Sequence, residues 1–237
     1  MTKYIIEKFN DQESLAAGAC EILSNDIKLA LSQNDRAKIA LSGGKTPSTT
    51  YSYLGKQSLP WERVDVFLGD ERCVNLDNPN SNAKMIKNTL LLSAPGSKAN
   101  FYFLKDLGLI SPQEGANKFS NLLKNSFNSD FPAFDLIVLG LGSDGHTASL
   151  FPYSETLKIA DQPTSFALGN GQARITLTHP ILSSAKKIIF LVSGDSKQQA
   201  LKRLVTPSES SERTPAKLVR PTSDILILCD VASSMLI

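Results

Sequence analysis

Short apolar runs recur along the chain, and polar residues containing glycine follow most of them. Phe134–Leu139 (FDLIVL) is the clearest example. Such runs, when bounded by turn residues, are typical of strands buried on both faces. The predicted strands are Tyr4–Phe9, Ala37–Leu41, Val64–Leu68, Phe101–Leu104, Phe134–Leu139, Lys187–Val192 and Ile225–Cys229.

Helical periodicity fills the stretches between these runs. Asn10 and Glu13 suggest a capping box, after which apolar residues from Leu15 to Ala30 recur three and four positions apart. Alternating strands and helices predict an α/β fold, Rossmann-like and doubly wound, with a mainly parallel sheet and helices on both faces. The other predicted helices are Asn82–Leu92, Pro112–Lys124 and Lys197–Val205.

Composition narrows the class of protein. The chain has 237 residues, and we expect one domain over 1–237 because it has no internal repeat and no long linker. With 41% hydrophobic and 20% charged residues, it is neither a disordered chain nor a coiled coil. The net charge of +2 gives no field that favours nucleic acid or an anionic membrane as partner. We expect a monomer with a small-molecule substrate.

The cysteines and the N-terminal residues indicate the cellular compartment in which we expect the protein. Cys20, Cys73 and Cys229 are odd in number and form no CxxC pair, which favours a reduced, intracellular chain. Glu7 comes too early for the apolar region of a signal peptide. No apolar run approaches the roughly 18 residues of a membrane span. We therefore expect a cytoplasmic protein.

Polar segments follow four of the predicted strands. In an open parallel sheet, ligands bind outside the carboxyl ends of the strands, so these segments should meet at one edge. Ser42–Pro47 (SGGKTP) combines two glycines with a helix start, which suits either an anion cradle or a tight turn. It is not a nucleotide P-loop, because Ile39 stands where that motif needs glycine. The four segments are 42–47, 69–72, 140–146 and 193–197.

The segment 140–146 (GLGSDGH) offers two interpretations. Its glycines match G-x-G-x-x-G, but Pro152 follows too soon for a regular crossover helix, which disfavours a dinucleotide site. His146 closes the segment, with Asp144 two residues before it. Histidine titrates near neutrality and can serve as a general base, although a lone histidine is more often structural. His179 has no comparable polar neighbours, and we expect it to be structural.

Cationic residues complete the expected site. Arg72 follows a strand, where it is either part of a solvated turn or a bidentate partner for phosphate. Lys197 is either a surface lysine or a point charge beside a helix start. Histidines and cysteines show no zinc spacing, although carboxylate sites for other metals stay open, and no G-x-S-x-G elbow is present. The residues thus predict an anionic small-molecule site with a histidine base.

Several motifs, in order along nearly the whole chain, resemble those of the 6-phosphogluconolactonases, within a wider group that includes glucosamine-6-phosphate deaminases. The most specific is the long segment from Phe134 to Pro152. The resemblance implies hydrolysis of 6-phospho-D-glucono-1,5-lactone to 6-phosphogluconate in the oxidative pentose phosphate pathway. Because the chain lacks metal-ligand spacing and disfavours a dinucleotide site, we expect this reaction to need no cofactor and no metal. The other matching segments are Leu41–Pro47, Asp70–Val74, Asn80–Asn82, Arg174–Thr178 and Ser193–Lys197.

The resemblance also implies roles for individual residues. His146 would activate water, assisted by Asp70 or Asp144. The deaminases carry Asn-Glu where this chain has Leu150 and Phe151, which favours the lactonase. A non-catalytic sugar-phosphate regulator is the other alternative, although no DNA-binding segment is found. The implied substrate- and phosphate-binding residues are Ser42, Gly43, Gly44, Thr46, Arg72, Arg174 and Lys197.

Overall fold

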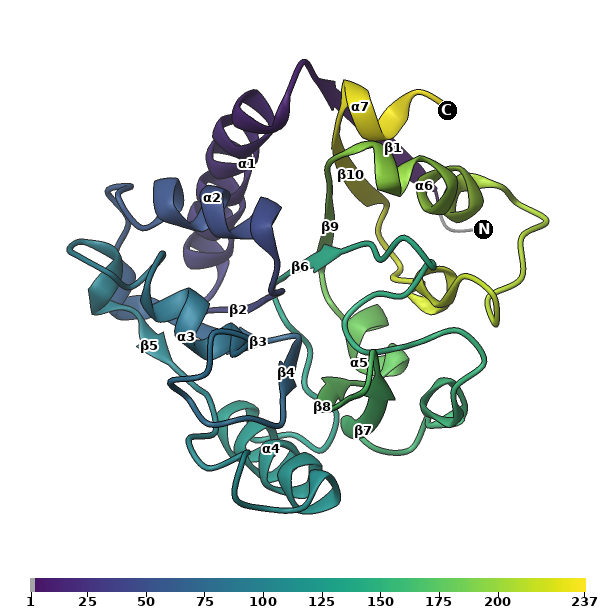
Figure 1. Cartoon of the computed structure of the whole chain (residues 1–237). Helices are drawn as coiled ribbons and strands as arrows, with labels where there is room; N and C mark the ends of the chain where they lie inside the picture. The colour runs from purple at the N-terminus through teal and green to yellow at the C-terminus, as the bar shows by residue number, and fades with distance from the viewer. Residues whose placement is uncertain (1–2) are drawn as a thin grey trace.

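The computed structural model describes residues 3–237 and contains a seven-stranded sheet in which every pair of neighbours is parallel (Figure 1). The strand order is β1-β10-β9-β6-β2-β3-β5, so the chain winds outward in opposite directions from β2 and β6. The α/β prediction with a mainly parallel sheet is thus confirmed. The strands are β1 Tyr4–Phe9, β2 Ala37–Leu41, β3 Val64–Leu68, β5 Asn100–Phe101, β6 Leu136–Gly140, β9 Lys187–Val192 and β10 Ile225–Asp230.

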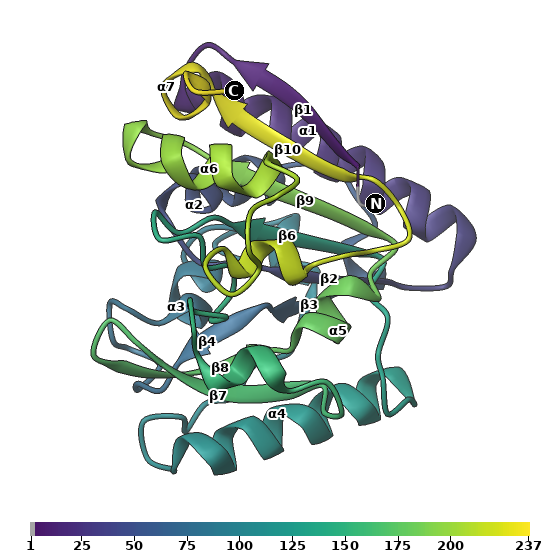
Figure 2. The ribbon, with the colours of Figure 1, turned by 90° about the vertical axis from the view of Figure 1, so that its right-hand side faces the viewer.

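Helices cover both faces of this sheet (Figure 2). Because side chains alternate along a strand, Leu136 and Val138 of β6 pack into one hydrophobic cluster, with α1 and α2. Ile137 and Leu139 pack into the other, with α4, α5 and α6. The helices are α1 Gln12–Gln33, α2 Lys45–Leu54, α3 Asn82–Lys87, α4 Pro112–Phe127, α5 His179–Ser183, α6 Gln198–Val205 and α7 Val231–Ser234.

A second, three-stranded antiparallel sheet was not predicted. It joins β4 Asp70–Arg72 to the hairpin of β7 Thr164–Gly169 and β8 Gln172–Leu177. Asn170 and Gly171 form the hairpin turn, both with positive φ (53° and 72°), as a two-residue turn between twisted strands requires. The Asn-Gly pair was the sequence signal for this hairpin.

Several element boundaries differ from the prediction. Among them, β6 begins at Leu136 rather than Phe134, and α4 runs to Phe127 rather than Lys124. Asp11, not Asn10, caps α1, because its carboxylate accepts the backbone N–H of Ser14 at 2.8 Å, and Ser14 rather than Glu13 completes the capping box. The strand expected at Phe101–Leu104 spans only Asn100–Phe101, since β3 pairs with just these two residues. The helix expected over Asn82–Leu92 ends at Lys87.

Within residues 3–237, no helix is both long and apolar enough to span a membrane.

Candidate active site

The polar segments that follow β2, β3, β6 and β9 meet at one edge of the parallel sheet, as predicted. They surround a cavity of about 450 Å³ beside the point where the winding reverses between β2 and β6. A sugar phosphate fits such a volume. Of the ten predicted site residues, only Asp144 does not line the cavity, and Asp144 contacts one that does. The nine are Ser42, Gly43, Gly44, Thr46, Asp70, Arg72, His146, Arg174 and Lys197.

His146 is paired with Asp144. Its Nδ1 lies 2.6 Å from Asp144 Oδ1, and its backbone N–H donates to the same oxygen at 3.1 Å. Burial alone would raise the pKa of Asp144, but the hydrogen bonds and charge of His146 outweigh it and lower that pKa to about 2. An ionised carboxylate at Nδ1 favours the tautomer with the proton there, which leaves the Nε2 lone pair free to accept a proton.

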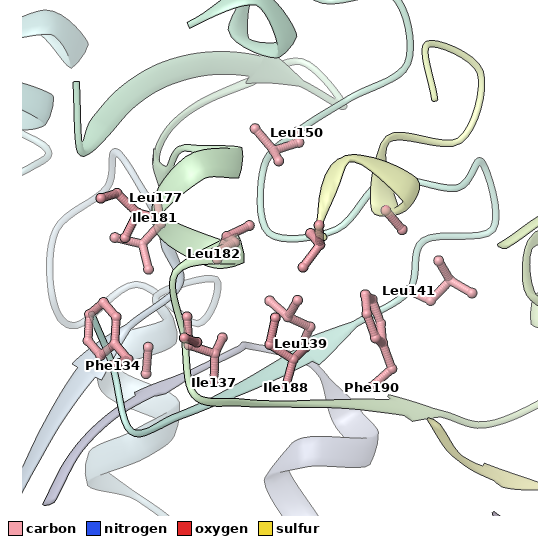
Figure 3. Packing of buried hydrophobic residues seen from close by; sticks show 14 of the residues in the cluster. Phe134, Ile137, Leu139, Leu141, Leu150, Leu177, Ile181, Leu182, Ile188 and Phe190 are labelled. Carbon is pink, nitrogen blue, oxygen red and sulfur yellow. The ribbon is translucent and has the colours of Figure 1, made fainter. Parts of the chain in front are cut away.

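The loop that carries His146 is fixed to the hydrophobic core at both ends. Leu141 and Leu150 are buried and point into the cluster on that face of the sheet (Figure 3). Between them, a Cβ atom on Gly142 would lie 2.1 Å from His146 Nδ1, so only glycine leaves room for the His146–Asp144 pair. The Phe151 ring packs against His146, with centroids 4.7 Å apart. The imidazole is thus held on several sides.

The segment after β2 forms the opposite wall of the cavity. Gly44 has φ +120° and precedes α2 without any side-chain cap, which leaves N–H groups at the helix start for a ligand. Gly43 lies so close to Asn82 that a Cβ atom would come within 1.9 Å of the Asn82 amide oxygen. Pro47 lies in the first turn of α2, as predicted. These features fit the anion cradle rather than a plain turn.

Arg72 and Arg174 face each other across the antiparallel pair of β4 and β8. Burial, followed by the positive charge of Arg72, lowers the pKa of the Arg174 guanidinium. Like charges opposite each other destabilise a sheet, so an anion between them is favoured. Arg72 is therefore not part of a solvated turn.

Unsatisfied polar groups mark the same wall. Buried polar groups normally have hydrogen-bond partners, and a buried group without one often awaits a ligand. Six buried side-chain atoms within residues 3–237 have no such partner, and three of them, Ser42 Oγ, Arg72 Nε and Arg174 Nε, belong to residues that line the cavity. This concentration points to a polar ligand.

Asp70 is buried, and both of its carboxylate oxygens have polar partners. Its Oδ2 accepts the Ser149 hydroxyl at 2.5 Å and lies 3.7 Å from Arg174 Nη1, while its Oδ1 accepts Asn82 Nδ2 at 3.2 Å. These contacts tie together the loop after β6, the second sheet and the start of α3. The geometry gives Asp70 the role of holding Arg174 and Ser149 in place.

The remaining residues divide between the cavity and its surroundings. Lys197 lines the cavity, where burial lowers the pKa of its ammonium group. Gln12 and Lys45 also line it. Lys45 lies within the predicted segment 42–47 but was not singled out as a binding residue, and Gln12, an ordinary helix-start residue, gave no signal in the sequence. His179 lies outside the cavity at the start of α5, as expected.

Within residues 3–237, no cluster of three or more His, Cys, Asp or Glu residues is placed to hold a metal.

Comparison with known proteins identifies the family. The family model described as "Glucosamine-6-phosphate isomerases/6-phosphogluconolactonase" matches residues 10–228. This chain belongs to that family. Within it, the chain is 37% identical to the 6-phosphogluconolactonase of Synechocystis sp., over 93% of this chain and 92% of that protein. It is 36% identical to the 6-phosphogluconolactonase of Nostoc sp., over 98% and 97%.

A solved structure agrees with this assignment. The crystal structure of a 6-phosphogluconolactonase from Shewanella baltica superposes with a TM-score of 0.85 at 25% identity, covering 98% of each chain. The likeness therefore extends to the whole fold, including the small antiparallel sheet. The chain belongs to the 6-phosphogluconolactonases within the family.

Proposed function

We propose that this protein hydrolyses 6-phospho-D-glucono-1,5-lactone to 6-phosphogluconate in the pentose phosphate pathway. One observation carries the proposal: a histidine with a free nitrogen shares a cavity with two opposed arginines. A lactone is an activated ester, so a positioned water, a base and stabilisation of the oxyanion are sufficient for hydrolysis. The arginines and Lys197 suit the phosphate group of the same substrate.

The proposed reaction uses His146 twice. Nε2 takes a proton from water as the water oxygen attacks the C1 carbonyl, and Asp144 stabilises the imidazolium that forms. The tetrahedral intermediate then collapses, and the bond between C1 and the ring oxygen breaks. The imidazolium returns its proton to that oxygen, which becomes the hydroxyl group at C5. The sum is one water added to one lactone, and the histidine ends neutral.

Phosphate recognition is assigned to the cationic wall. Arg72 and the Gly43–Gly44 cradle are the proposed principal contacts, with Arg174 and Lys197 as further cations. Ser42 and Thr46 line the same cradle. Four cationic side chains line the cavity against one carboxylate, Asp70, so the cavity attracts an anion. The four are Lys45, Arg72, Arg174 and Lys197.

Phe151 is a side chain by which this site differs from that of the related deaminases. The resemblance to the wider group implies that those enzymes carry a carboxylate in this part of the motif. Here the Phe151 ring packs on His146 and also lies 5.4 Å from Arg174 Cζ. An aromatic ring cannot exchange protons with a substrate amine or hydroxyl group. The site therefore favours the lactonase over a deaminase.

A paired assay tests the proposed function. The purified protein should accelerate hydrolysis of freshly generated 6-phosphogluconolactone above its spontaneous rate, and it should release no ammonia from glucosamine-6-phosphate. Acid production reports the first reaction and a coupled ammonia assay reports the second. Ammonia release without lactone hydrolysis would instead identify a deaminase. Binding of both sugar phosphates without turnover would identify a regulator.

Dialysis against a strong chelator should leave the lactonase rate unchanged. The proposed reaction needs only water, a histidine and cationic side chains, so metal removal takes away none of its parts. The measurement is the initial rate before and after dialysis, at equal protein concentration. A rate that is lost and then restored by one divalent ion would refute this expectation.

The expectations that the protein is a monomer and that it is located in the cytoplasm stay predictions.

A further inference from the structure

The loop that carries His146 is held from outside by a distant part of the chain. We name residues 209–216, which follow α6, the strap. The backbone N–H of Ala216 donates to the Gly145 carbonyl at 3.1 Å, and the N–H of Tyr153 donates to the Glu212 carbonyl at 3.1 Å. In Figure 1 this yellow-green segment lies beside the teal chain that follows β6. The strap thus contacts the loop on both sides of His146.

The strap has an ordered structure of its own. Thr214 is fully buried, and its hydroxyl donates to Glu209 Oε1 at 2.9 Å. Gly145 packs directly on Thr214: a Cβ atom on Gly145 would lie 3.1 Å from Thr214 Cα, and the φ of Gly145 is +97°. The residue next to His146 is therefore pressed against a fixed surface.

Arg203 adds a side-chain contact to this support. It lies in α6, whose Leu201 and Leu204 are buried in the core, so its backbone is firmly placed. Its Nη2 donates to the Ser143 carbonyl at 3.2 Å, one residue before Asp144. Arg203 does not line the cavity. Its Nε is buried without a hydrogen-bond partner, so within residues 3–237 the Ser143 carbonyl is the one acceptor that the guanidinium binds.

We propose that Arg203 is a positioning residue for lactone hydrolysis, which with the strap fixes the loop carrying Asp144 and His146. The proposal rests on the proposed function. A base displaced by about 1 Å can lose roughly 10²-fold in rate, because proton transfer and attack need close alignment. Arg72, Arg174 and the Gly43–Gly44 cradle, which are assigned to phosphate, lie on β4, on β8 and at the start of α2, and only Lys197 directly precedes the helix of Arg203. Loosening the loop should therefore lower kcat and leave KM nearly unchanged.

The test replaces Arg203 by methionine, which keeps most of the aliphatic stem and removes the donors. Lys202→Met is the matched control, since Lys202 is the exposed neighbour on the same last turn of α6. We expect Arg203→Met to lower kcat by about 10-fold, with KM within about twofold, because only alignment of the base is lost. Arg203→Lys, which restores one donor, should recover most of kcat. Lys202→Met should behave as the parent.

Amide hydrogen exchange separates this proposal from the proposed function. In Arg203→Met the amides of residues 142–147 should exchange faster, whereas those of the buried strand β6 should not, whichever reaction the protein catalyses. A parent without lactonase activity would refute the function, and exchange would still decide whether Arg203 holds the loop. Unchanged kcat and exchange in Arg203→Met would overturn the proposal. The proposal would also be overturned if the lower kcat came with a higher KM and a lower melting temperature, because that combination indicates a general structural role.

Discussion

Replacing His146 by asparagine should lower the turnover of 6-phosphogluconolactone by roughly 10²- to 10⁴-fold, the usual contribution of a positioned general base. Asparagine retains a polar group that can meet Asp144, so the loop should keep its fold. Its amide cannot take a proton from water. Because the side chains assigned to phosphate lie elsewhere, the variant should bind 6-phosphogluconate about as tightly as the parent does.

The measurement is the enzymatic rate after subtraction of spontaneous lactone hydrolysis, together with the Kd for 6-phosphogluconate by calorimetry. His179→Asn is the matched control, because it makes the same substitution at the other histidine of the chain, outside the cavity. That variant should keep parent turnover. A folded His146→Asn protein with near-parent turnover would show that His146 is structural, and the base would then have to be sought at Asp70 or Asp144.

The parallel sheet and the place of the site could be predicted from the sequence. Runs such as Phe134–Leu139 are too short and too apolar for surface helices, and their alternation with helices implies parallel strands. Parallel strands bring their carboxyl ends to one edge, and this rule alone placed His146, Arg72 and Lys197 around one cavity. Local pattern and topology were sufficient there, because each residue directly follows a strand or lies shortly after it.

The small antiparallel sheet could not be read in the same way. Asp70–Arg72 has three charged residues in succession, which is typical of a solvated turn, and only its pairing with β8 makes it a strand. The contact between Arg72 and Arg174 depends on register between segments far apart in the chain. Similarly, Asp70 is engaged by Ser149 and Asn82 from two other elements. Such contacts are set by tertiary packing, which leaves no periodic signal in the sequence.

Replacing Arg72 by alanine should chiefly weaken binding of the phosphorylated substrate. Removing one partner of a buried charge pair typically costs about 2–5 kcal/mol, which corresponds to roughly a 30- to several-thousand-fold higher Kd. The folded state should tolerate the change, because it also relieves the repulsion that Arg174 feels from Arg72. Unphosphorylated gluconolactone, which lacks the anion, should lose far less in kcat/KM.

The decisive measurement is therefore the ratio of kcat/KM for the phosphorylated lactone to that for the unphosphorylated lactone, in parent and variant. Arg72→Ala should reduce this ratio, because the arginine acts on the phosphate and not on the reacting carbonyl. Arg220→Ala is the matched control, since Arg220 is exposed and does not line the cavity. It should leave the ratio unchanged. If Arg72→Ala hydrolysed the phosphorylated lactone as well as the parent does, the phosphate would have to be held by Lys197 and the Gly43–Gly44 cradle instead.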